Sequence, residues 1–462
     1  MSTTIILLNL LLVVLFVRRQ YRKHGSFLQL GIIFVASLTL GYPIRLLMVA
    51  YSDDVVTEFP LSVYRDSLLE LSVISCLGMG LFMLAYAWVD GRRGQYRFLC
   101  SDSTDRANEP IALVWFLLFV SILGKLIKIG TGNYVSFLLA QGADLAYSNV
   151  VENMHRAGWV ALAAIWILFF RGKLTRFKDL LLLCFVTGLE FTYQIIQGSK
   201  TFLMLPLLIL ALCYYYSKKR VPLIFGAFAI VFMVLFVFPF VSAFRDVMQR
   251  DYHGIPSISN FDPITLISET ARVAFFDDSI ANPHGVPGSA SATALQRFGA
   301  ADELLRFVEV VPRQLPYKYG ADFLGVLFSI IPRAVWPDKP IFSPGAEFGA
   351  WLNTITSVTP FPIGEMYWNG GYLGVIFGML LWGVTLAFAM RLTGRLFWAK
   401  GAQLYVVAIF LAELYWFTSM ESMLPMVIAS LIQKTIIYFV LFKIFKIFTS
   451  RRHHGIPLSE RR

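Results

Sequence analysis

Apolar runs alternate with short polar connectors along most of this chain. A helix that crosses a membrane needs about 20 mostly apolar residues, and the pattern predicts eleven such segments. They lie at 3–17, 27–44, 67–89, 111–129, 157–170, 180–196, 202–216, 221–244, 364–390, 403–417 and 423–448. Three of them are short, so a count between ten and twelve also fits. The chain is 57% hydrophobic with a mean hydropathy of +0.65, and we expect an all-α, polytopic membrane helix bundle.

The alternation stops between the eighth and ninth segments. From 245 to 362 the chain gathers arginines, prolines and aromatic residues instead of a span-length apolar run. We therefore predict three parts: a bundle of eight spans over 1–244, a large exterior loop over 245–362, and three further spans with a tail over 363–462. The loop is where we expect the function, because it concentrates charge beside the lipid.

Basic clusters follow alternate apolar segments and indicate the orientation. The six clusters lie at 18–23, 92–97, 171–178, 218–220, 391–400 and 443–452. By the positive-inside rule they are cytoplasmic, which places the N-terminus and the large loop outside and the C-terminus inside. The same rule accounts for the net charge of +11, so no nucleic-acid partner is expected. Because Arg18 and Arg19 follow the first apolar run, we expect an anchor rather than a cleaved signal peptide.

The exterior loop contains three predicted helical pieces. Asp262 and Pro263 form a helix start, an N-cap acid followed by proline, and the helix continues over 264–276. A second helix is predicted over 292–310. The apolar run 323–331 is too short to cross the membrane, so we expect an interfacial or a re-entrant helix that ends before Arg333.

Signatures of several common enzyme classes are absent. The sequence has no Walker loop, no HExxH motif, no GxSxG motif and no dinucleotide fingerprint, which argues against ATP-driven transport and zinc hydrolysis. Adjacent acids at 53–54 and 277–278 could bind a divalent ion, but such pairs are more often solvated surface. We therefore predict neither a metal nor a cofactor.

Arginines in the loop are candidates for binding a phosphate group. The guanidinium donates two parallel hydrogen bonds and stays charged, whereas an arginine that snorkels or pairs with an acid needs no ligand. The candidate residues for a substrate diphosphate are Arg245, Arg272, Arg297 and Arg333. Lys200 joins them, because it follows a tight exterior turn and begins a helix whose dipole attracts anions.

Glu365 is the candidate general base. It begins the ninth apolar segment among Met366, Tyr367 and Trp368, and a positioned carboxylate can take a proton from a reacting hydroxyl. The alternative is an acid that only caps a helix N-terminus. His284 is the fallback base, since an imidazole needs little tuning for this role.

Deeper in the membrane, Glu190, Glu413 and Lys434 are costly without partners. We expect Glu413 to pair with Lys434. Lys125 and Lys128 lie on the outer side and could reach the interface by snorkelling.

Three stretches add a resemblance to this picture. Gly198-Ser199-Lys200 opens an apolar segment, residues 331–340 contain Arg333 and Lys339, and residues 363–374 contain Glu365. Together with the span pattern and the large loop, they resemble the Wzy-type O-antigen polymerases, which join oligosaccharide repeat units. In one respect the chain departs from the family. Some members carry an arginine eleven residues before a glycine, and no loop arginine here has that spacing.

The resemblance implies a metal-independent glycosyltransferase of the GT-C type in the bacterial inner membrane. Its substrates would be undecaprenyl-diphosphate-linked oligosaccharides at the periplasmic face, and a chain-length regulator protein is a candidate partner beside the membrane lipid. Matching positions carry over Arg333, Lys339, Glu365 and Lys200 as site residues. Two alternatives stay open: an O-antigen-ligase-like transferase, which differs in its acceptor, and a transporter or flippase of lipid-linked glycans, for which inverted repeats or broken helices are typical.

Overall fold

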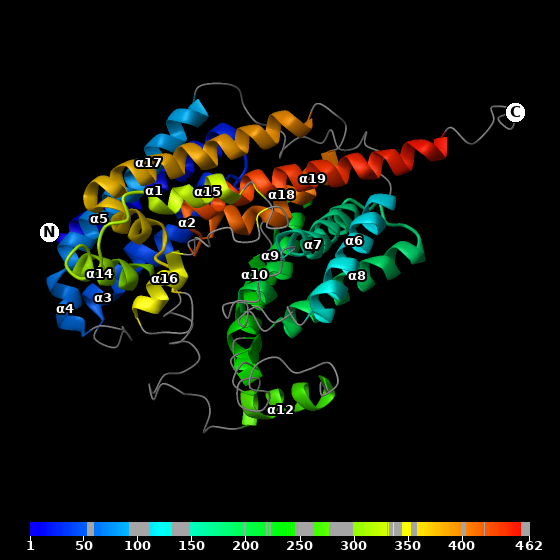
Figure 1. Ribbon diagram of the computed structural model, residues 1–462, viewed down its shortest axis with the longest axis horizontal. Coiled ribbons are helices and arrows are strands. Elements are labelled where there is room, and N and C mark those ends of the chain that lie inside the picture. Colours follow the sequence, from blue (N-terminus) through cyan, green and yellow to red (C-terminus); the bar gives the residue numbers. More distant parts are fainter. Residues whose placement is uncertain are drawn as a thin grey trace, which may run out of the picture.

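The computed structural model is all helical over the residues that it describes, with no strand among them (Figure 1). The described residues are 1–52, 60–91, 111–131, 148–197, 200–218, 220, 223–237, 239–241, 243, 244, 247, 263–276, 299–329, 331, 336, 344–352, 358–398, 403–419 and 421–453. The helices of the bundle are α1 (Ser2–His24), α2 (Leu30–Thr39), η1 (Leu40–Ile44), α3 (Arg45–Tyr51), α5 (Leu68–Gly91), α6 (Ala112–Gly130), α7 (Ser148–Phe170), α8 (Phe177–Ile196), α9 (Lys200–Lys218), α10 (Leu223–Phe232), η5 (Met233–Val237), α17 (Pro362–Trp398), α18 (Gln403–Thr418) and α19 (Leu424–His453). The shorter helices are α4 (Leu61–Asp66), α12 (Pro263–Phe276), α14 (Ala300–Val310), η7 (Ala321–Phe323), α15 (Leu324–Ser329) and α16 (Pro344–Trp351).

Among the described residues, a helix overlaps each of the eleven predicted apolar segments. Within the described ranges, seven helical spans are long and apolar enough to cross a membrane: Ser2–His24, Leu30–Tyr51, Leu68–Gly91, Ala112–Gly130, Val150–Phe170, Pro362–Arg391 and Leu424–Phe445. Met204–Lys218 and Leu404–Glu413 are shorter apolar helices. The prediction of a helical membrane protein is thus confirmed, and the count of eleven spans stays a prediction.

The bundle helices pack through aromatic rings and small residues. In Figure 1, α1, α2, α5 and α17 lie in one part of the molecule and α6 to α9 in the other. Phe34 of α2 lies 4.8 Å, between ring centroids, from both Phe82 of α5 and Trp382 of α17. Between α6 and α7 the backbones approach closely, because a Cβ added to Gly124 would lie 2.6 Å from the backbone nitrogen of His155. Such small-residue contacts replace the hydrophobic effect where lipid surrounds the helices.

Helices α12 and α14 of the 245–362 loop lie within the ranges that the sequence predicts. Helix α12 starts at Pro263 and ends at Phe276, as expected from the Asp262-Pro263 start. Phe275 of this helix lies 6.0 Å from Phe236 of η5, which places α12 on that part of the chain. Helix α14 begins at Ala300, inside the predicted range 292–310. Residues 292–298 of that range fall outside the described part of the chain.

Helix α14 is attached to the bundle by a buried ion pair. Arg45 donates to both carboxylate oxygens of Asp302, with Nε to Oδ1 at 3.0 Å and Nη2 to Oδ2 at 2.8 Å. The Tyr64 hydroxyl donates to Asp302 Oδ1 at 2.5 Å. Arg45 is 2% exposed and Asp302 4%. A buried bidentate pair fixes both position and orientation. It therefore holds α14 against Arg45 of α3 and Tyr64 of α4.

Helix α15 corresponds to the short apolar run 323–331. It packs against α19, yet Leu324 and Leu327 are 51% and 64% exposed. A segment packed inside the protein would bury these side chains. The described part of the run therefore lies on the surface of the bundle, which favours the interfacial alternative over the re-entrant one.

We predict that replacing Arg45 with Met destabilises the protein by about 3–5 kcal/mol, because it leaves the buried Asp302 carboxylate without its counter-charge. Thermal unfolding of the purified protein in detergent measures this loss. The matched control is Arg272→Met, which removes an exposed arginine that is paired with Glu269 at 2.7 Å and is expected to cost at most about 1 kcal/mol. Equal unfolding temperatures for the two variants would show that the Arg45 pair does not hold α14.

Candidate functional site

Three of the eight predicted site residues lie in the described part of the chain. They are Lys200, Arg272 and Glu365, whereas Arg245, His284, Arg297, Arg333 and Lys339 lie outside it. Lys200 begins α9, as the tight turn before it predicts. The structure thus tests only part of the predicted constellation.

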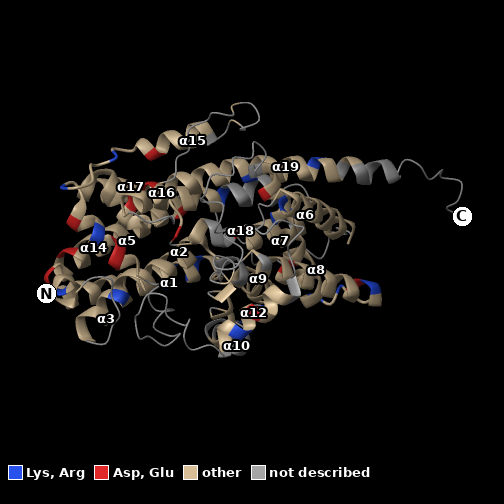
Figure 2. Ribbon diagram, turned by 60° about the horizontal axis from the view of Figure 1, so that its bottom comes forward, with Lys and Arg blue, Asp and Glu red and all other residues tan. Residues whose placement is uncertain are grey.

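Arg272 does not lie with Glu365. It is exposed on α12, where it forms two hydrogen bonds with Glu269, at 2.7 and 3.1 Å. Figures 1 and 2 both show α12 near α10 and apart from α14 and α16. In this conformation Arg272 is a surface residue that is paired three positions along its own helix.

Glu365 lies on a broken helix. Helix α17 is interrupted at Gly370 and Gly371, and Gly371 has φ 58° and ψ −138°, a conformation that is open in practice only to glycine. A Cβ added to Gly374 or Gly378, after the break, would overlap Met366, before it. The two-turn piece 362–369 therefore folds against the start of the long piece that follows.

Elements from the bundle and from the 245–362 loop converge on this two-turn piece. The Ile363 amide donates to the Tyr42 hydroxyl at 3.3 Å. Trp368 lies 5.4 Å from Phe307 of α14 and 5.7 Å from Phe348 of α16, between ring centroids. The piece 362–369 is therefore the place where the 245–362 loop packs on the bundle helices.

The end of the two-turn piece is capped by the loop segment that follows α14. The amides of Lys318 and Tyr319 donate to the carbonyls of Trp368 and Asn369, both at 3.1 Å. The Gly320 amide donates to Asn369 Oδ1 at 2.9 Å. The last carbonyls of a helix need such partners. The loop amides thus replace the helical hydrogen-bond donors that the break in α17 removes.

The Glu365 carboxylate is fully buried and half satisfied. Its Oε2 accepts a hydrogen bond from the Leu424 amide at 2.9 Å, whereas Oε1 has no partner among the described residues. Glu365 therefore caps α19, a different helix from the one expected to be capped. The second oxygen remains available to accept a hydrogen bond from a hydroxyl group.

Lys318 and Asp322 lie within electrostatic range of Glu365. Lys318 Nζ donates to Asp322 Oδ1 at 2.9 Å and to Glu347 Oε2 at 2.6 Å, and it lies 4.0 Å above the Trp368 ring. Burial raises the pKa of the Asp322 carboxyl, and Glu347 adds to this, although the Lys318 ammonium opposes both. Asp322 Oδ2 has no partner among the described residues.

Sequence reasoning missed Lys318, Asp322 and Glu347. Their only local signal is the four-residue spacing of Lys318 and Asp322, which is common on any polar surface. Glu365, Asp322, Glu347 and Lys318 together comprise three carboxylates and one ammonium. This arrangement suits proton transfer better than anion binding, since its excess charge is negative.

A second buried polar cluster lies between α6, α7 and α8. Lys125 Nζ contacts Glu190 Oε1 at 2.5 Å, and Glu152 pairs with Lys128 at 2.7 Å and with Arg156 at 2.8 Å. Lys125 and Lys128 therefore form buried pairs rather than snorkelling. Neither ring nitrogen of the buried His155 has a hydrogen-bond partner among the described residues.

The predicted ion pair between the last two spans is confirmed. Lys434 of α19 pairs with Glu413 of α18, and the Tyr438 hydroxyl donates to the second Glu413 oxygen at 2.7 Å. Intramembrane charges that are paired in this way are tolerated because each removes the other's need for water.

Fold and site together define an all-α membrane protein in which part of the 245–362 loop packs on a broken helix with a buried glutamate. Residues 154–450, more than half of the chain, match the family model described as a domain of unknown function (DUF8712), and the chain belongs to this family. The match includes Glu365, the loop segment 318–322 and His155, whereas Lys125, Lys128 and Glu152 precede it. No curated protein and no solved structure matches the chain.

We predict that Gly158→Ala destabilises the protein by about 1–3 kcal/mol, because a Cβ on Gly158 would overlap Glu190 Oε1 and Ser121 Oγ. The matched control is Gly188→Ala in α8, where nothing lies within 4 Å of the added Cβ and the alanine is expected to be neutral or to stabilise the helix by about 0.5–1 kcal/mol. Thermal unfolding of both variants in detergent compares them. A loss at Gly188 as large as at Gly158 would argue against the close packing of Glu190.

Proposed function

We propose that this protein is a glycosyltransferase that joins undecaprenyl-diphosphate-linked oligosaccharide repeat units into a surface polysaccharide. The observation that carries the proposal is the buried Glu365 carboxylate, with one unpaired oxygen, at the point where the exterior loop meets the broken helix. The resemblance to the Wzy-type polymerases supports the substrate class. A membrane-bound donor also suits a site that lies among membrane helices.

The proposed location is the bacterial inner membrane, with eleven spans, a periplasmic N-terminus and a cytoplasmic C-terminus. The packing agrees with this alternation, since α3 runs antiparallel to α1 and α5 runs parallel to it. Tyr51, at the end of α3, donates to Thr3, at the start of α1, at 3.1 Å, and Lys23, at the end of α1, pairs with Asp90, at the end of α5, at 2.7 Å. In this topology α14, α16 and Glu365 lie on the periplasmic side.

In the proposed reaction Glu365 takes the proton from a hydroxyl group of the acceptor sugar. The hydroxyl oxygen then bonds to the anomeric carbon of the donor, and the bond from that carbon to the diphosphate breaks. The diphosphate leaves with the electron pair on its lipid. A positioned base contributes about 10²–10⁴-fold in rate, and the donor bond supplies the energy, so neither nucleotide nor metal is required.

Access to Glu365 requires a movement of the loop. The carboxylate is 0% exposed in the described conformation, and the segment 318–320 covers the end of the two-turn helix that carries it. The acceptor reaches the unpaired oxygen when this segment separates from residues 368 and 369. Closure of the same segment would exclude water from the reacting sugars.

The leaving diphosphate needs cations beyond those around Glu365. Preorganised positive charge stabilises a developing anion most where water is excluded, yet Lys318 is balanced there by Asp322 and Glu347. We propose the loop residues Arg245, Arg272, Arg297, Arg333 and Lys339, with Lys200, as the source of this charge. An O-antigen-ligase-like transferase would use the same groups and differ only in its acceptor.

A transporter of lipid-linked glycans is the second candidate. Two observations favour it: the break in α17 at Gly370 and Gly371, and the buried charges around His155. Broken helices and intramembrane ion pairs are typical of transport proteins. Purified protein in liposomes distinguishes the two, because a polymerase lengthens lipid-linked glycans on one side, whereas a transporter moves them across unchanged.

We predict that Glu365→Gln abolishes polymer and accumulates single lipid-linked repeat units. The glutamine oxygen can still accept the hydrogen bond from Leu424, so the cap on α19 is kept while proton acceptance is lost. Mass spectrometry of the lipid-linked glycans in a deletion strain that carries the variant provides the measurement. Glu309→Gln on α14 is the matched control and is expected to retain long chains.

Two further outcomes assign the base. Long chains from Glu365→Gln beside an inactive His284→Ala would transfer the role to the histidine. Long chains from Glu365→Gln together with an unstable Glu365→Ala would leave Glu365 with the capping role alone and remove it from the mechanism.

The orientation is predicted independently of the chemistry. Reporter fusions after Ala300 should behave as exported, and fusions after Lys400 as cytoplasmic, because the basic clusters place these positions on opposite sides. Alkaline phosphatase and green fluorescent protein activities read the two sides. The reverse result at either position would contradict the periplasmic site and the proposed function with it.

A further inference from the structure

The exposed face of α1 changes from apolar to cationic along its length. Its apolar members, spaced three or four positions apart, are between 49% and 61% exposed: Leu7, Leu8, Leu11, Val14 and Leu15. The same spacing continues into Arg18, Arg19 and Arg22, all of them exposed. Residues at this spacing share one face of a helix. Helix α1 therefore presents one continuous stripe that ends in three guanidinium groups.

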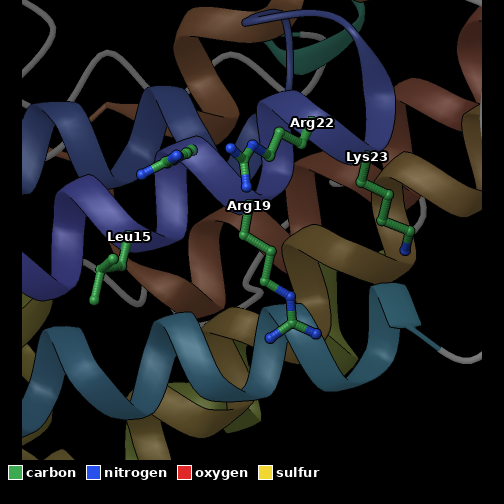
Figure 3. A pocket seen from close by; sticks show the side chains of 5 residues that line it. Leu15, Arg19, Arg22 and Lys23 are labelled. Carbon is green, nitrogen blue, oxygen red and sulfur yellow. The ribbon is translucent and has the colours of Figure 1, made fainter.

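The cationic end of the stripe surrounds a pocket. Its volume is about 530 Å³, and it is lined by Leu15, Arg18, Arg19, Arg22 and Lys23 (Figure 3). The pocket is open to its surroundings rather than enclosed. The pocket is lined by one apolar side chain and four cations, so its ligand should join a negative charge to an apolar part.

Only some of the positive charges at this end of α1 are paired with an acid. Lys23 pairs with Asp90 of α5 at 2.7 Å, and His24 contacts the same carboxylate at 2.9 Å. These contacts fix the end of α1 against α5. Within the part of the chain that the structure describes, Arg18, Arg19 and Arg22 pair with no acid. Three permanent positive charges thus face one pocket, where an anion would offset their mutual repulsion.

The spacing along α1 matches the depth of one lipid leaflet. From Leu8 to Arg18 the helix rises about 15 Å, which is half of the roughly 30 Å hydrocarbon core. When the apolar part of the stripe lies against acyl chains, the arginines lie at the level of the lipid phosphates. The order of residues on α1 is therefore the order of groups in a phospholipid.

We infer that the α1 pocket binds the phosphodiester headgroup of an anionic phospholipid, with its acyl chains along Leu8, Leu11 and Leu15. The guanidinium fork suits phosphate oxygens, and basic pockets beside membrane helices are known to take such headgroups. The pocket lies at the opposite end of α1 from Thr3, whose hydroxyl accepts a hydrogen bond from Tyr51 of α3. This inference is therefore independent of the proposed glycosyltransferase.

A general attraction of cytoplasmic basic residues to anionic lipid is the alternative. Lys173, Arg176 and Lys178 provide a matched control. The first two are exposed on the connection between α7 and α8, and Lys178 is exposed at the start of α8. Replacing them removes the same charge on the same predicted side of the membrane. Only the α1 group is gathered on one helix face around the pocket.

Native mass spectrometry of the purified full chain, titrated with phosphatidylglycerol, cardiolipin and phosphatidylcholine, tests the inference. We expect both anionic lipids to bind at least tenfold more tightly than phosphatidylcholine. The variant R18Q/R19Q/R22Q should lose this preference, and K173Q/R176Q/K178Q should keep it. The variant R18K/R19K/R22K should lose part of it, because lysine keeps the charge without the fork.

Several results would overturn the inference. Equal losses in the two glutamine variants would show a general charge effect, and an unchanged R18Q/R19Q/R22Q would show that the pocket is not the site. Displacement of the lipid by equimolar inorganic phosphate would mean that the acyl chains contribute nothing. Tighter binding of a polyprenyl phosphate than of phospholipid would assign a different occupant. If R18Q/R19Q/R22Q fails to fold, R18Q and R22Q singly should each weaken anionic lipid binding, and no change in either contradicts the inference.

Discussion

Charge buried away from water is the constraint on which the arrangement of this protein depends. An unpaired charge in a low-dielectric interior is far more costly than a paired one, so each buried charge restricts which helices can be neighbours. Arg45 meets Asp302 across 257 positions of sequence, and Lys125 meets Glu190 across 65. Apolar packing alone would leave the rotation of each helix weakly specified, since lipid is as apolar as the helix faces. The ion pairs determine that rotation.

The broken helix extends this logic from charges to backbone groups. Opening α17 at Gly370 and Gly371 leaves carbonyls at the end of the two-turn piece, and the loop segment 318–320 satisfies them. The start of α19 needs an acceptor, and Glu365 on the same piece provides it. The loop, the break and α19 are therefore interdependent. A movement of the loop that exposes Glu365 would also release the carbonyls that it caps, so opening has an intrinsic free-energy cost.

The parts of the fold that depend on local pattern could be predicted, and the parts that depend on pairing between distant elements could not. A described helix overlaps every predicted apolar segment, and α12 begins at Pro263 because proline and its preceding acid act locally. The pair between Glu413 and Lys434 could be predicted, because they are opposite charges within adjacent apolar segments. Nothing in the spacing of Arg45 indicates Asp302 as its partner. The apolar neighbours of Glu365 indicate a candidate base. Lys318 and Asp322 look like ordinary polar loop residues in the sequence, because only the packing of the loop on the broken helix brings them near Glu365.

The charge balance around Glu365 narrows the search for the groups that would bind a diphosphate. Three carboxylates, Glu365 included, and one ammonium would repel a dianion, so at least three further cations are needed to reverse the sign of the local charge. Sequence separation ranks the candidates. Arg297 stands three positions before Ala300 of α14 and Arg333 four after Ser329 of α15, and a chain spans at most about 3.6 Å per residue. Helix α14 packs directly on the piece that carries Glu365, whereas Arg272 belongs to α12 on the other side of the molecule (Figure 1). Arg297 and Arg333, which are close in sequence to α14 and α15, are therefore the stronger candidates for binding the proposed diphosphate.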